Sequence, residues 1–135
     1  MVPEVDRWGA GRRRDGKESR TVLLVEDDED TRMSLAELLE EHGYAVAPAS
    51  NGLEAQKYLQ GHPVPDCIVF DLWMPQMDGW TFASSVAGGL EPPIPMMVIT
   101  AAESHWGYPI HPRFVLRKPL DSAKFLGMVD ALAAA

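Results

Sequence analysis

Short apolar runs of strand length recur along the chain after residue 20. Four of them do not alternate with polar residues: Val22–Val25, Cys67–Phe70, Met96–Ile99 and Phe114–Leu116. Strands that are apolar at successive positions are buried on both faces, as in a parallel sheet covered by helices. A weaker run, Ala45–Ala47, predicts a further strand.

Segments with apolar residues at helical spacing separate these runs. Four helices are predicted: residues 30–42, a segment from Asn51-Gly52, about Trp80 to Val86, and about Ser122 to the C-terminus. The first carries its apolar residues at Met33, Leu35, Leu38 and Leu39, and the second at Leu53, Ala55 and Leu59. Gly43 favours a left-handed cap after the first helix. Strands that alternate with helices predict an α/β fold with a doubly wound sheet.

Residues 1–20 lack apolar periodicity and predict a flexible N-terminal arm, which leaves residues 21–135 as one compact domain. The arm carries six Lys and Arg against four acids, whereas the remainder carries six against sixteen, within a net charge of −8. So acidic a domain would repel nucleic-acid phosphates, and we expect no nucleic-acid partner. We expect no membrane partner either, because no apolar run reaches the length of a membrane span.

The single cysteine, Cys67, excludes an internal disulfide and lies in an apolar run, which predicts a core thiol. A chain without disulfides is compatible with a cytoplasmic location, which we expect here.

Polar residues with potential chemistry follow the apolar runs. They are Glu26-Asp27-Asp28 after the first strand, Asp71 after Phe70, Thr100 after Ile99, and Lys118-Pro119 after the last strand. The carboxyl ends of parallel strands lie along one edge of a sheet, where open α/β sheets bind ligands. We therefore expect carboxylates, a hydroxyl and an ammonium group to converge there.

Such a cluster suits phosphoryl transfer. Clustered carboxylates repel one another unless a cation is present, and oxygen ligands favour Mg2+. A carboxylate beside Mg2+ can attack a phosphoryl group, while Thr100 and Lys118 could contact the phosphoryl oxygens. A single acid at a strand end is more often a helix N-cap. It is the combination at several strands that favours the chemical interpretation.

Four motifs occur in a specific order. They are Val25-Glu26-Asp27-Asp28, the segment from Asp71 to Gly79 (DLWMPQMDG), Ile99-Thr100-Ala101 and Lys118-Pro119. Together they resemble the motifs of response-regulator receiver domains of two-component systems, over about residues 21–135. The resemblance implies a flavodoxin-like sheet of five parallel strands in the order 2-1-3-4-5, flanked by helices.

The resemblance also implies a role for each residue of the phosphoryl site. Asp71 matches the phosphoacceptor, Thr100 the switch hydroxyl and Lys118 the phosphate-binding lysine. The Lys118-Pro119 bond is a candidate cis peptide, which this family often has.

A metal site is implied in the same way. Glu26 and Asp27 match the acidic pair that binds Mg2+, for which Mn2+ can substitute, together with Asp71 and the backbone carbonyl of Trp73. Asp28 lies just beyond the pair and is expected to support it or to cap the helix that follows.

The implied function is a phosphorylation-activated signalling switch of the single-domain type. Asp71 would receive a phosphoryl group from a sensor histidine kinase or a small phosphodonor. Output would be contact with an effector protein, or passage of the phosphoryl group to a histidine phosphotransfer protein. We expect a monomer or weak dimer that catalyses only its own phosphorylation and dephosphorylation.

Two departures from the family pattern bear on output. Val115 stands three positions before Lys118, where the family often has an aromatic switch residue, and Phe114 is one position too early to replace it. The segment between Thr100 and Lys118 is also short and contains two prolines, which predicts a short or irregular fourth helix.

Three other functions remain open on the sequence. The first is an interaction module that works without phosphorylation. The second is a phosphatase of the haloacid dehalogenase type, which generally needs a second Asp where this chain has Trp73. The third is a flavin-binding flavodoxin, which would need a phosphate-binding loop where this chain has an acid.

Overall fold

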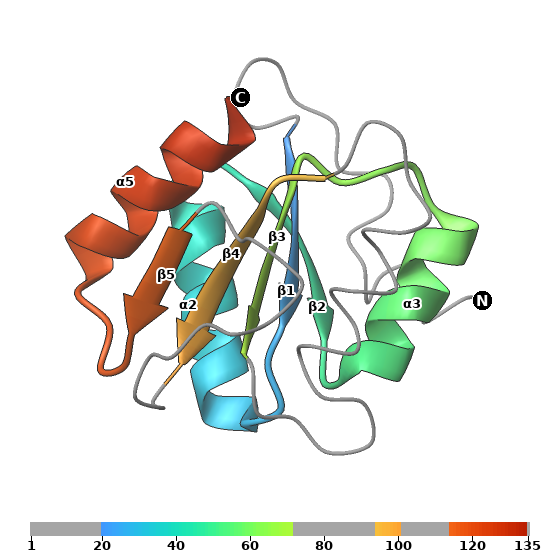
Figure 1. Cartoon of the computed structure of the whole chain (residues 1–135), viewed down its shortest axis with the longest axis horizontal. Coiled ribbons are helices and arrows are strands. Elements are labelled where there is room, and N and C mark those ends of the chain that lie inside the picture. Colours follow the sequence, from blue (N-terminus) through green and yellow to red (C-terminus); the bar gives the residue numbers. More distant parts are fainter. Residues whose placement is uncertain (1–19, 72–93, 101–113, 135) are drawn as a thin grey trace.

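A computed structural model describes residues 20–71, 94–100 and 114–134 (Figure 1). Within them, five strands form one sheet in the order β2-β1-β3-β4-β5. The strands are β1 (Thr21–Val25), β2 (Ala45–Ala49), β3 (Cys67–Asp71), β4 (Met96–Thr100) and β5 (Phe114–Arg117). Every neighbouring pair is parallel. The predicted fold class and strand order are confirmed.

Three helices accompany the sheet in the described ranges: α2 (Glu29–Glu41), α3 (Gly52–Gly61) and α5 (Ser122–Ala133). One core cluster packs α2 and α5 against one face of the sheet, with Leu39 and Phe125 fully buried. A second cluster packs α3 against the opposite face through Ala55 and Tyr58. Because side chains alternate along a strand, each strand supplies both clusters, which explains why the runs are apolar throughout.

Each of these helices begins at a side-chain cap. Asp28 accepts from the Thr31 N–H at 2.9 Å, Asn51 from the Glu54 N–H at 2.9 Å, and Asp121 from the Lys124 N–H at 3.0 Å. Such caps satisfy backbone donors that the first helical turn leaves without a partner. At the other end of α2, Gly43 has a φ of 106°, as the sequence predicted.

Two positions of the apolar helical pattern are solvent-exposed. Met33 keeps 61% of its surface and Leu53 keeps 48%, although the pattern grouped them with buried residues. Met33 lies two positions before the buried Leu35, and residues two apart point to nearly opposite sides of a helix. The strip that packs on the sheet is therefore narrower than the pattern indicated.

Several sequence predictions concern residues outside the described ranges. They are residues 1–19 of the arm, Trp73, the helix from Trp80 to Val86, and residues 101–113 with the predicted irregular helix. Within the described part of the chain, no helix is long and apolar enough to cross a bilayer.

A polar contact joins α5 to the C-terminal end of α2. Asp130 accepts from the Tyr44 hydroxyl and lies 3.0 Å from Nε2 of His42. Tyr44 is almost fully buried. Burial raises the pKa of its hydroxyl, and the hydrogen bond to Asp130 raises it further.

We predict that Phe125→Ala lowers the free energy of unfolding by about 3–5 kcal/mol, because it leaves a cavity in the core shared by α2 and α5. Urea unfolding measures this loss. Met33→Ala is the matched control at an exposed position, and its effect should stay within about 0.5 kcal/mol. Equal losses for the two variants would contradict the packing described above.

We predict that Tyr44→Phe costs about 1 kcal/mol at pH 7, because Asp130 loses a hydrogen bond. The folded protein holds the hydroxyl proton more tightly than the unfolded chain, where the ordinary pKa is 10.0. The stabilisation is therefore fully present below pH 10 and is lost as pH rises above it. Urea unfolding of both proteins from pH 7 to 11 should show the difference narrowing; a widening difference would contradict the assignment.

Candidate phosphoryl and metal site

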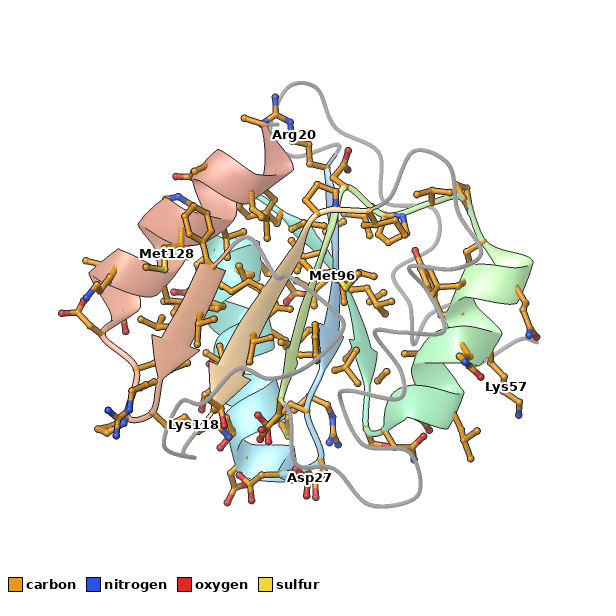
Figure 2. All side chains as sticks on the ribbon, viewed as in Figure 1. Arg20, Asp27, Lys57, Met96, Lys118 and Met128 are labelled. Atoms are coloured by element: carbon orange, nitrogen blue, oxygen red, sulfur yellow. The ribbon has the colours of Figure 1, made fainter. Side chains whose placement is uncertain are left out.

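The candidate residues meet at the carboxyl-terminal edge of the sheet, as the sequence predicted. Glu26 and Asp27 follow β1, Asp71 ends β3, Thr100 ends β4 and Lys118 follows β5. In Figure 2, Asp27 and Lys118 lie at the same edge of the sheet, below the strand ends. The parallel register brings together residues that lie up to 92 positions apart.

Lys118 joins two carboxylates in this cluster. Its Nζ lies 2.9 Å from Oδ2 of Asp71 and 3.1 Å from Oε1 of Glu26. The Glu26 side chain has no exposed surface, whereas Asp71 keeps 8% and Lys118 keeps 24%. The peptide bond between Lys118 and Pro119 is cis, as predicted.

Burial and charge shift the pKa values in this cluster. Loss of hydration is the largest cause for Glu26 and raises its pKa, although hydrogen bonds from the Asp28 N–H and from Lys118 act in the opposite direction. The nearby Asp71 charge raises it further. Burial alone would lower the pKa of Lys118, but its hydrogen bonds to Asp71 and Glu26 outweigh this, and the net shift is upward.

Three carboxylates lie close enough to bind one metal ion. One ligand oxygen each from Glu26, Asp27 and Asp71 lies within 4.8 Å of the others. Glu26 and Asp71 are buried, whereas Asp27 is exposed to solvent. An all-oxygen set of this size suits a hard divalent cation such as Mg2+, which binds through a few carboxylates and keeps several waters. The residues therefore fit the predicted Mg2+ site; Trp73, the remaining predicted ligand, lies outside the described residues.

Thr100 is fully buried at the end of β4. Its carbonyl oxygen accepts from the Lys118 N–H at 2.8 Å, which fixes the start of the loop after β5. Thr100 at the end of β4 and Lys118 just after β5 are thus placed at the same edge of the sheet, because these two strands are neighbours.

Asp28 caps the N-terminus of α2, which is one of the two roles that the sequence predicted for it. Its Oδ2 accepts from both the N–H and the hydroxyl of Thr31. These hydrogen bonds, that of the hydroxyl first, lower the pKa of its carboxyl. Its own N–H donates to Oε2 of Glu26 at 3.1 Å. Asp28 therefore joins α2 to the cluster without lying in it.

Arg32 is a neighbour of the cluster that the sequence analysis did not single out. Its NH1 nitrogen donates to the carbonyl oxygens of Glu26 at 2.9 Å and Asp27 at 3.4 Å. The signal was present in the sequence, because Arg32 is the first cation after an unbroken acidic run from Glu26 to Asp30.

Comparison with known proteins agrees with this geometry. The response regulator receiver domain family matches residues 22–129. Protein PilH of Pseudomonas aeruginosa is 30% identical over 118 residues, which cover 84% of this chain and 97% of PilH. CpdR of Brucella abortus, a response regulator receiver protein, is 38% identical over 81 residues, or 60% of this chain and 66% of CpdR.

Some relatives are much longer than the matched segment. The transcriptional regulatory protein PdtaR of Mycobacterium tuberculosis is 42% identical over 83 residues, which cover 61% of this chain but 39% of PdtaR. The match to the sensor histidine kinase CheAY of Helicobacter pylori spans 48% of this chain and only 8% of CheAY.

Solved structures show the same fold. The receiver domain of a signal transduction histidine kinase from Syntrophus aciditrophicus superposes with a TM-score of 0.76 at 27% identity, covering 85% of this chain and 90% of that one. The chemotaxis response regulator CheY4 of Vibrio cholerae gives 0.73 at 25% identity, covering 84% and 98%. With its motifs, sheet order and acidic cluster, this chain belongs to the receiver domain family of two-component response regulators.

Proposed function

We propose that this chain is a signalling switch that accepts a phosphoryl group on Asp71 from a sensor histidine kinase or a small phosphodonor. Family membership implies phosphorylation-dependent signalling and interaction with histidine kinases and downstream effectors. The observation that carries the finer assignment is the contact of 2.9 Å between Lys118 Nζ and Asp71 Oδ2, beside two further carboxylates. A lysine in this position can stabilise the negative charge of the Asp71 carboxylate and then that of the phosphoryl oxygens when Asp71 becomes an acyl phosphate.

In the proposed reaction, a carboxylate oxygen of Asp71 attacks the phosphorus atom of a phosphohistidine. The new O–P bond forms as the P–N bond breaks, and the imidazole leaves with the electron pair and takes up a proton. Lys118 stabilises the negative charge on the phosphoryl oxygens, and the Thr100 hydroxyl donates to one of them. Hydrolysis of the acyl phosphate later restores Asp71. Apart from onward transfer of the phosphoryl group to a histidine phosphotransfer protein, these are the only reactions that we assign to the protein.

Glu26, Asp27 and Asp71 would hold Mg2+, with the Trp73 carbonyl as a further ligand. The ion supplies charge neutralisation to the attacking carboxylate and to the phosphoryl oxygens when it is bound. Asp27 is the most accessible of the three carboxylates, since it alone is exposed. Mn2+ offers similar oxygen chemistry and can take the same place.

We place this switch in the cytoplasm, as a monomer or weak dimer. Its output is contact with an effector protein or transfer of the phosphoryl group to a histidine phosphotransfer protein. An interaction module that works without phosphorylation is not favoured, because the acidic cluster and its lysine are all present.

We predict that Mg2+ stabilises the wild-type protein against heat, because a ligand that binds only the folded state shifts the unfolding equilibrium. At about ten times the dissociation constant the gain is about 1.4 kcal/mol. Asp27→Asn should lose most of it, since an amide oxygen carries no charge. A thermal scan with and without Mg2+ measures the difference.

Asp30→Asn is the matched control for the Mg2+ measurement. Asp30 is also exposed, lies in the first turn of α2 and is outside the three-carboxylate cluster. It should respond to Mg2+ as the wild type does. An equal gain of thermal stability with Mg2+ in Asp27→Asn and the wild type would show that Asp27 is not a ligand of the metal ion.

We predict that acetyl phosphate adds one phosphoryl group to the wild-type protein in the presence of Mg2+, as measured by intact mass. Asp71→Asn should gain no phosphoryl group, because a side-chain amide is a much weaker nucleophile than a carboxylate. Chelation of Mg2+ should prevent labelling of the wild type. Asp30→Asn is again the control, and it should gain one phosphoryl group as the wild type does. Labelling of folded Asp71→Asn to the wild-type extent would assign the acceptor elsewhere, and absence of labelling in all proteins would favour the phosphorylation-independent module.

A further inference from the structure

We infer that Arg32 is a positioning residue for the metal site, which holds the backbone of Glu26 and Asp27 so that their carboxylates converge with Asp71. This inference rests on the proposed function, because it concerns the Mg2+ affinity of the same cluster. Arg32 acts through the loop and not on the phosphoryl group. The contacts that it makes are with backbone carbonyl oxygens, not with the reacting carboxylate.

The loop from Glu26 to Asp28 is anchored at both of its ends. The Glu26 N–H donates to the Ala49 carbonyl at 3.0 Å, and the Asp28 N–H donates to the Glu26 side chain at 3.1 Å. The Asp28 carbonyl accepts the Arg32 N–H at 2.8 Å as part of the first turn of α2.

The Glu26 and Asp27 carbonyls lie between these anchors, past the end of β1. The Arg32 guanidinium donates to both, at 2.9 and 3.4 Å, and the first is the stronger contact. One side chain thus fixes the two peptide groups from which the metal-binding side chains project. Groups that orient metal ligands in this way commonly change metal affinity without touching the ion.

The helix dipole does not explain a cation at this position. Arg32 lies in the first turns of α2, where the helix dipole disfavours positive charge, while the last turn of α2 has no basic residue. The arginine is also half-buried, so it is not a simple solvated surface charge. Its local interactions are attraction to the Asp28 carboxylate and the pair of hydrogen bonds to the acidic loop, which alone are specific to the backbone of Glu26 and Asp27.

Electrostatics and positioning predict opposite effects when Arg32 is replaced. A cation beside a metal site repels the metal ion, so removal of its charge alone would tighten metal binding. Loss of the two hydrogen bonds would let the acidic loop move and weaken metal binding. The direction of the change therefore decides between the two effects.

The test measures Mn2+ binding by full-length protein from the EPR signal of the free ion, with Mg2+ as competitor. We expect Arg32→Met, which keeps the length of the apolar stem but donates no hydrogen bond, to bind Mn2+ about tenfold more weakly than wild type. Arg32→Leu also lacks a donor, should behave in the same way, and replaces Arg32→Met if that variant does not fold. Arg32→Lys keeps the charge and part of the hydrogen bonding, and should recover much of the affinity.

Lys57→Met is the control, because it makes the same change of charge at an exposed position on α3. Lys57 lies far from Asp27 and Lys118 in Figure 2. Its affinity for Mn2+ should match that of the wild type. Unchanged or tighter binding by folded Arg32→Met or Arg32→Leu overturns the positioning role, even when the wild type binds Mn2+ through Asp27 and Asp71. Absence of Mn2+ binding by the wild type itself overturns the proposed metal site and this inference together.

Discussion

The contact of the Lys118 ammonium with two buried carboxylates is the constraint on which the functional edge depends. Glu26 has no exposed side-chain surface, and a buried carboxylate without a partner is costly. Lys118 provides a counter-charge to Glu26 after β1 and to Asp71 at the end of β3. Because Lys118 follows β5, this contact forms only when β4 and β5 have added to the sheet in the correct order. The same interaction thus ties the end of β5 to the ends of β1 and β3 and assembles the site.

The compensation of charge at this edge is incomplete. The Lys118 ammonium contacts two of three carboxylates whose ligand oxygens lie within 4.8 Å of one another, and the Arg32 guanidinium contacts only the backbone beside them. The net negative charge is unfavourable for the isolated fold but favourable for binding a divalent cation. Repulsion between the carboxylates lowers the stability of the fold without metal, and the same negative charge raises the affinity for a divalent cation. Such a loss of stability is common where residues are arranged for function. Burial raises the pKa of Glu26, and the nearby charge of Asp71 raises it further.

The sequence predicted those parts of the site that depend on strand ends. Runs that are apolar at successive positions predicted a parallel sheet, and a parallel sheet places the strand ends that carry Glu26, Asp71 and Lys118 along one edge. The order of the strands came from the resemblance to receiver domains. The exposure of Met33 was not predicted, because the width of a buried helical strip depends on how α2 packs on the sheet. The contact between His42 and Asp130 joins residues 88 positions apart, and no local pattern marks it. Arg32 was missed for another reason, since its partners are backbone carbonyls, which every residue possesses.

The position of Val115 constrains how the phosphorylated state can be detected by a partner. Val115 lies on β5 at the edge of the sheet, is half-buried and packs against the core cluster on the α3 side. A valine side chain is short and strongly prefers one rotamer, so it cannot swing between a buried and an exposed place as an aromatic ring can. Lys118 lies three residues further along the same segment and has three N–H donors, two of which point to Asp71 and Glu26. Under the proposed phosphorylation of Asp71, phosphoryl oxygens would compete for these donors, and this exchange would need no rotation at Val115. In that proposed switch, Lys118 rather than the side chain of residue 115 would be the group at this edge that responds to the phosphoryl oxygens.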